Sequence, residues 1–82
     1  MRYTVELKPR ALKDLKGIPQ EDQRRVTQKL ELLETDLQGD VKKLSDFFPE
    51  YRLRVGPWRA LFDLEGNRIV VYRILHRSRA YS

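Results

Sequence analysis

The chain contains four short stretches in which apolar and polar residues follow the pattern of β-strands. Every second residue is apolar in 3–7 and again in 51–55, which is typical of strands that are buried on one face only. Two further apolar stretches, 59–64 and 69–75, follow along the chain. Short turns that contain glycine separate the last three stretches, which therefore predict two consecutive antiparallel hairpins.

Two helices are predicted between the first strand and the second. Pro9 suits the first turn of a helix, and Gly17 suits the position that ends it. A second helix follows at once, with Glu21 and Asp22 in its first turn, where the helix dipole favours acidic side chains. Its apolar residues recur at spacings of four, three and four, which gives the helix one buried side. These residues are Val26, Leu30, Leu33 and Leu37, and the helix is expected to end at 38–40.

The remaining segment, 41–49, is expected to be an irregular connector whose Leu44, Phe47 and Phe48 pack under the sheet. The order of elements is then βααβββ. This order predicts an α+β fold in which a helical hairpin covers one face of an antiparallel sheet. Because the 82 residues contain no repeat and no linker-like tract, they are expected to form one domain, 1–82.

Composition argues against several classes of function. The chain has no cysteine, and its one histidine and scattered acidic residues offer no spacing for metal ligands, so no metal or other cofactor is expected. Its longest apolar run, 69–72, is far too short to cross a membrane, and no signal-peptide pattern is present. A cytoplasmic protein without a membrane partner is expected.

The net charge of +5 is concentrated in the last part of the chain. Residues 50–82 carry seven arginines, no lysine and three acidic residues. Guanidinium groups bind phosphate oxygens in pairs and stack on bases, so this composition favours a nucleic acid or an acidic protein segment as partner. A solvated basic face explains the composition about equally well. The arginines are Arg52, Arg54, Arg59, Arg68, Arg73, Arg77 and Arg79.

Strand alternation places up to five of these arginines on one open face of the predicted sheet. Arg52 and Arg54 share the face opposite to the apolar residues of their strand. Arg73 and Arg77 lie on one side of the last strand. Arg59 is the first residue of the middle strand, which lies between that strand and the strand of Arg52 and Arg54. Each arginine alone is well explained as part of a polar open face, but the set predicts a cradle for a nucleic acid backbone.

Cleavage of RNA is the reaction that suits such a site, because RNA carries its own nucleophile in the 2′-hydroxyl. Arginine can stabilise the charge on the phosphorane but stays protonated and cannot act as a base. The proton carriers are therefore sought among Tyr81, His76 and Glu50. Taken alone, the histidine and the tyrosine are more often structural residues. Trp58, at a hairpin tip, suits either stacking on a base or covering the core.

Four fragments, in order, resemble the RelE branch of the RelE/ParE toxin superfamily over nearly the whole chain. The most specific fragment is similar to the family hairpin "YRLRVGDYRVIY", and the last is similar to its closing "V-x-H-R-R-x-x-Y". The fragments are YTVEL and ALKDL with Ile18-Pro19, VKKL at 41–44, YRLRVGPWRALF at 51–62 and RILHRSRAY at 73–81.

This resemblance implies a toxin of a bacterial toxin–antitoxin pair. Such a toxin enters the ribosomal A site, cuts translated mRNA and is held inactive in a complex with its cognate antitoxin. Arg59 and Arg77 match by position the family arginines that stabilise the scissile phosphate. Tyr81 matches the C-terminal tyrosine that orients or stacks the RNA and takes part in proton transfer in some proposals. An acidic amphipathic antitoxin segment that folds on binding would suit the basic groove.

Arg52 and Arg54 fall where some family members carry lysines, one of which is proposed as the general base. Because arginine is a poor base, His76 or Glu50 is expected to fill that role here. The alternatives are a ParE-like inhibitor of DNA gyrase without nuclease activity and a weakly catalytic member whose groove mainly binds antitoxin. The residues expected to contact RNA are Arg52, Arg54, Arg73, Arg79 and Trp58.

Overall fold

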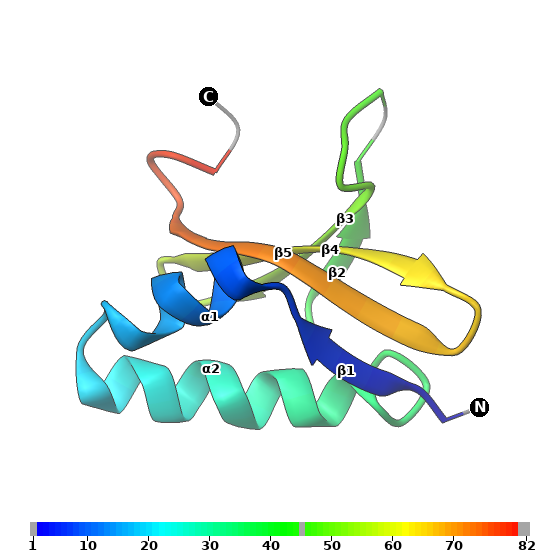
Figure 1. The fold of residues 1–82 in the computed structure, drawn as a ribbon, viewed down its shortest axis with the longest axis horizontal. Coiled ribbons are helices and arrows are strands. Elements are labelled where there is room, and N and C mark those ends of the chain that lie inside the picture. The colour runs from blue at the N-terminus through cyan, green and yellow to red at the C-terminus, as the bar shows by residue number, and fades with distance from the viewer. Residues whose placement is uncertain (1, 45, 81–82) are drawn as a thin grey trace.

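The computed structural model describes residues 2–44 and 46–80, which form a helical layer packed on a five-stranded sheet (Figure 1). The expected α+β fold with two helices on one face is confirmed. The elements are β1 (Thr4–Leu7), α1 (Pro9–Lys16), α2 (Gln20–Leu33), β2 (Val41–Lys43), β3 (Tyr51–Val55), β4 (Trp58–Glu65) and β5 (Arg68–His76).

The strand order in the sheet is β1-β5-β4-β3-β2. The two predicted hairpins are present, and Gly56 and Gly66 supply the positive φ angles of their turns, +56° and +63°. The strands β3 to β5 are antiparallel, as expected, and β2 pairs antiparallel with β3. By contrast, β1 pairs with β5 in parallel, with Val5 opposite Ile69. The sheet is therefore mixed, because the helical hairpin carries the chain from one edge of the sheet to the other.

The segment expected to be an irregular connector differs from the prediction. Its first residues form β2, where Val41 pairs with Leu53. Three residues are too few to show an alternating pattern, so this strand was missed. The two phenylalanines do not pack under the sheet: Phe48 is 66% exposed, and its ring meets the edge of Tyr72 at a centroid distance of 5.2 Å. Figure 1 shows this segment rising on the face opposite to the helices.

The core lies between α2 and the sheet. Val26, Leu30 and Leu33 are buried on the predicted side of the helix. The helix ends at Leu33, one turn earlier than expected, because Asp36 and Leu37 adopt positive φ angles of 56°. The buried residues of the sheet that complete this core are Leu53, Val55, Ala60, Phe62, Ile69, Val71 and Ile74. With one face occupied by the helices, functional groups on the opposite face are free to meet a partner.

Candidate nucleic-acid interface

A cationic hollow of about 330 Å³ lies on the open face of the sheet. It is lined by Arg52 and Arg54 of β3, Arg59 of β4, and Lys42 and Leu44 at β2. The register explains the cluster, because Arg54 lies directly opposite Arg59 and Arg52 lies opposite Lys42. We call these five residues the arginine hollow. Four cations at this spacing repel one another and attract a polyanion.

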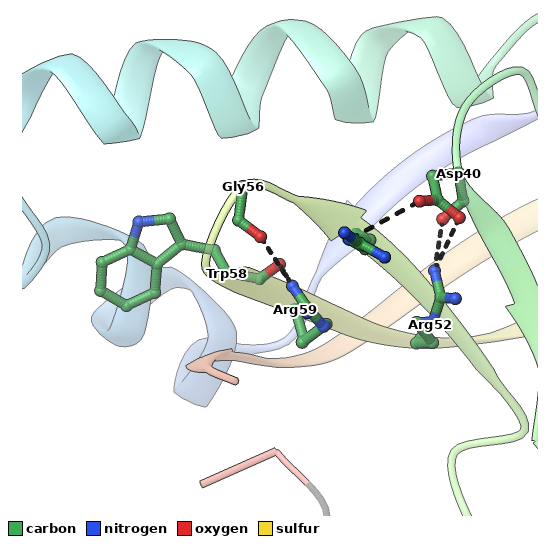
Figure 2. A network of polar contacts seen from close by, with 6 residues as sticks. Asp40, Arg52, Gly56, Trp58 and Arg59 are labelled. Atoms are coloured by element: carbon green, nitrogen blue, oxygen red, sulfur yellow. Dashed lines mark hydrogen bonds and ion pairs between the residues drawn. The ribbon is translucent and has the colours of Figure 1, made fainter. Parts of the chain in front are cut away.

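Asp40 provides an internal counter-charge for the arginine hollow (Figure 2). Nη1 of Arg52 donates to the backbone carbonyl of Asp40 at 2.8 Å and to its Oδ1 at 3.0 Å. Nε of Arg54 lies 3.8 Å from Oδ2 of the same carboxylate. The hydrogen bond from Arg52, followed by the charges of Arg52, Arg54 and Arg59, lowers the pKa of Asp40 against the opposing effect of burial. Sequence patterns gave no signal for this residue, which lies in an irregular turn.

Arg59 is held by the backbone of its own hairpin. Its Nη1 donates to the carbonyls of Gly56 at 2.8 Å and Trp58 at 2.9 Å (Figure 2). None of the ion pairs found among residues 2–44 and 46–80 involves Arg59. The two carbonyls thus orient the guanidinium without neutralising it. This arrangement suits a group that presents its other donors to a phosphate.

Arg73 is directed to the helical layer and does not line the arginine hollow. Its Nε and Nη2 donate to the carboxylate of Asp14 in α1 at 2.8 and 3.2 Å. The backbone N–H of Ile74 donates to the same carboxylate at 3.0 Å. Asp14 therefore ties α1 to the part of β5 that extends beyond its pairing with β1. The role expected for Arg73 in RNA binding gains no support from this geometry.

Burial would raise the pKa of Asp14, but the hydrogen bonds from Arg73 and Ile74 and the charges of Arg73 and Arg10 outweigh it and lower that pKa. A carboxyl whose pKa is lower in the folded than in the unfolded protein contributes stability above the unfolded value of about 3.9. This contribution is lost as the pH falls through the folded pKa. Acid should therefore weaken the attachment of α1 to β5.

Asp14→Asn should lower the free energy of unfolding at pH 7 by about 1–2 kcal/mol, because a hydrogen-bonded charge pair becomes a neutral contact. The difference in the free energy of unfolding between the variant and the unmodified protein should shrink below about pH 4, because the carboxyl of Asp14 then becomes protonated in the unmodified protein. Urea unfolding at several pH values measures both effects. Glu31→Gln, at an exposed position of α2, serves as the matched control. A difference that stayed constant at all pH values would contradict this account of Asp14.

Trp58 and His76 lie on the helix side of the sheet, away from Arg59. The two residues are paired across β4 and β5, and their rings meet edge to face at 5.5 Å. Nε1 of Trp58 donates to Oδ2 of Asp22 in the first turn of α2 at 3.0 Å. Nδ1 of His76 accepts the backbone N–H of Ser78 at 3.3 Å. The tryptophan thus fastens the hairpin to the helices, and the histidine is not in the arginine hollow.

The other expected site residues are dispersed. Arg77 is exposed just beyond β5, where its backbone N–H donates to the carbonyl of Pro57 at 2.7 Å. Arg79 lines a second hollow, of about 570 Å³, between α1 and β5, together with Trp58 and His76. Glu50 lies 3.7 Å from Nζ of Lys43 and does not line the arginine hollow. Tyr81 lies outside the described residues.

Clusters of metal ligands and membrane-spanning helices are both absent from the part of the chain that the structure describes. Within 2–44 and 46–80, no three His, Cys, Asp or Glu side chains are grouped so that they could hold a metal ion. None of the helices in these segments is long and apolar enough to span a bilayer.

Known proteins with the same fold include toxins of toxin–antitoxin systems. Toxin RelE3 of Methanocaldococcus jannaschii is 33% identical over 75 residues, which cover 85% of each protein. The RelB–RelE antitoxin–toxin complex from Methanococcus jannaschii contains a similar chain, with a TM-score of 0.74 at 29% identity, covering 88% of this chain and 89% of that one. The archaeal RelE–RelB complex from Pyrococcus horikoshii OT3 also contains a similar chain, with a TM-score of 0.78 at 26% identity. The match covers 98% of this chain and 100% of that one.

The family model of the ParE toxin of type II toxin–antitoxin systems matches residues 5–81. That match spans both helices and all five strands, so it includes the arginine hollow and the tail that follows β5. The chain therefore belongs to the RelE/ParE superfamily of type II toxins, as a member of its RelE branch.

Proposed function

We propose that this toxin is a ribosome-dependent endoribonuclease that cuts translated mRNA in the A site and so inhibits translation. It would act in the cytoplasm as one toxin domain, 1–82. The observation that carries the proposal is the arginine hollow, where Arg52, Arg54 and Arg59 meet on the face that the helices leave open. A set of guanidiniums at one place suits the backbone of an RNA strand, since each can bind two phosphate oxygens.

In the proposed reaction, the 2′-oxygen of the RNA attacks the adjacent phosphorus and the bond to the 5′-oxygen breaks. The products are a 2′,3′-cyclic phosphate and a 5′-hydroxyl, so the protein supplies no nucleophile and no metal-bound water. Arg59, oriented by two carbonyls, stabilises the charge that develops on the phosphorane. Arg77 assists from the end of β5. The proton carriers remain to be assigned, because neither His76 nor Glu50 lines the hollow.

The proposed partner in the resting cell is a cognate antitoxin. Solved structures that are similar to this chain include RelB–RelE complexes, in which a toxin chain is bound to RelB. On this chain, an acidic antitoxin segment over the arginine hollow would neutralise its cations and exclude RNA. Inhibition then requires no change in the toxin fold.

Expression in a translating cell tests this proposal against gyrase inhibition. We expect protein synthesis to stop and mRNA to be cut within reading frames at positions that follow the codon phase. Co-expression with a cognate antitoxin should restore growth. DNA damage with translation intact would contradict the nuclease proposal and favour a ParE-like inhibitor of DNA gyrase. Sequencing of mRNA 5′ ends and labelled amino-acid incorporation provide the two measurements.

A further inference from the structure

We propose that Asp40 is an internal substitute for a phosphate: in the resting toxin its carboxylate pairs with two arginines of the arginine hollow, Arg52 and Arg54, and the backbone of an RNA strand displaces it from Arg54. This inference rests on the proposed function, because it assumes that RNA enters this hollow. It assigns Asp40 a role in specificity. The residue would disfavour isolated small anions and admit a polyanion, which brings several phosphates at once.

The two carboxylate oxygens of Asp40 are shared between the arginines as two phosphate oxygens would be. Oδ1 accepts from Arg52 at 3.0 Å (Figure 2), and Oδ2 lies 3.8 Å from Nε of Arg54. Guanidinium groups bind carboxylate and phosphate by the same forked geometry. An anion that approached Arg54 would therefore meet a position already held by a carboxylate.

The two arginines hold this carboxylate unequally. The side chain of Arg52 is only 13% exposed and also donates to the backbone carbonyl of Asp40 at 2.8 Å. The side chains of Arg54 and Asp40 are 57% and 54% exposed, and their separation of 3.8 Å is long for an ion pair. Exposed pairs of this kind contribute little to stability. The contact between Arg54 and Asp40 is therefore the one that a phosphate can replace.

The backbone around Asp40 is fixed independently of its carboxylate. The N–H of Arg54 donates to the carbonyl of Asp40 at 3.0 Å, and the N–H of Val41 donates to that of Gly39 at 3.0 Å. Gly39 has φ +131°, and a Cβ there would lie 3.0 Å from Cδ1 of Leu53, so only glycine fits. Because these contacts involve the main chain, a neutral side chain at position 40 should keep the turn in place.

Competition between this carboxylate and an incoming anion explains the expected selectivity. An attached carboxylate is present at a high effective concentration and competes well with one free phosphate ion. An RNA strand contacts Arg54, Arg59 and Lys42 with successive phosphates and releases the counter-ions of each. The loss of one weak internal pair is then offset by several new contacts. Asp40 should thus weaken binding of every anion, but small anions most.

Asp40→Asn tests the proposal, with Asp40→Ser as a second neutral variant. The probe is a short RNA that is 2′-O-methylated at every residue and therefore cannot be cleaved. We expect both variants to bind it about 3–10-fold more tightly at low salt, with the slope of log K against log salt steeper by about 0.7, the value for one further phosphate contact on a single strand. Fluorescence anisotropy between about 50 and 200 mM salt measures both quantities.

Glu31→Gln is the matched control, because it removes one negative charge from the exposed surface of α2. Its affinity for the RNA should stay within about twofold of that of the unmodified protein, because a distant, exposed charge is largely screened by salt. In a second arm, inorganic phosphate should raise the melting temperature of Asp40→Asn and leave that of the unmodified protein almost unchanged. If neither Asp40 variant bound RNA more tightly than Glu31→Gln, the proposal would be overturned.

Arg54→Gln separates this inference from the proposed function on which it rests. If Arg54→Gln weakens RNA binding but the Asp40 variants match Glu31→Gln, the RNA site stands and Asp40 is only a structural residue of the turn. If Arg54→Gln leaves binding unchanged, the hollow is not the RNA site, and both proposals fail together. Circular dichroism of each variant confirms that the affinities belong to folded protein.

Discussion

Arg59→Ala should lower the rate of mRNA cleavage by about 10²–10³-fold, the usual cost of removing one donor that stabilises transition-state charge. The guanidinium is oriented by the carbonyls of Gly56 and Trp58, and none of the described ion pairs neutralises it. It is thus preorganised for charge that develops during the reaction. Arg59→Lys should recover little activity, because an ammonium cannot bind both carbonyls and phosphate in the same fork.

Single-turnover cleavage of mRNA on programmed ribosomes measures this effect directly, and growth after induction gives a second readout. Arg68→Ala is the matched control. It removes the same charge from the first residue of β5, where Arg68 pairs with Glu6 and Glu65 at 2.8 and 2.9 Å. We expect its cleavage rate to stay near that of the unmodified toxin. Equal losses in the two variants would mean that net charge, rather than a placed guanidinium, drives the reaction.

The arginine hollow was largely predictable from the sequence because it depends on local alternation. Arg52 and Arg54 had to share a face of one strand, and a tight hairpin brings Arg59 beside them. The contribution of Asp40 was not predictable. It depends on a turn between a helix and a three-residue strand, where positive φ angles and a glycine set the path of the chain. No periodic pattern reports such a turn.

Arg73 shows why alternation failed farther along the chain. A β-bulge between β4 and β5 leaves Tyr72 without a partner, since Leu61 pairs with Arg73 and Phe62 with Val71. The alternation therefore changes sides at this point, and Ile74 follows Val71 into the core. By this register Arg73 lies opposite Leu61, on the face of Arg52. Because it stands beyond the residues of β5 that pair with β1, its guanidinium can still reach Asp14 of α1, 59 residues earlier in the sequence. A pair so distant in sequence cannot be inferred from one sequence without knowledge of the packing.

The identity of the proton carriers is constrained by where the structure places the candidates. His76 lies beside Trp58 on the helix side, and its Nδ1 already accepts the N–H of Ser78. The carboxylate of Glu50 faces Lys43 rather than the arginine hollow. Neither residue is positioned to take a proton from an RNA bound by Arg52, Arg54 and Arg59. Tyr81, the third expected proton carrier, lies outside the described residues, and its candidacy rests on its match by position to the C-terminal tyrosine of the family.

Tyr81→Phe should therefore lower cleavage by about 10²-fold, within the range for loss of a proton carrier, whereas His76→Gln and Glu50→Gln should each stay within about threefold of the unmodified toxin. Tyr72→Phe removes a hydroxyl near Glu65 and is the matched control for the tyrosine. The measurement is the single-turnover cleavage rate on ribosomes across a range of pH. A loss of about 10²-fold in His76→Gln would instead establish the histidine as a proton carrier. The helix side of the β4–β5 hairpin would then have to open during catalysis, because the ring must leave Trp58 to reach the same phosphate as Arg59.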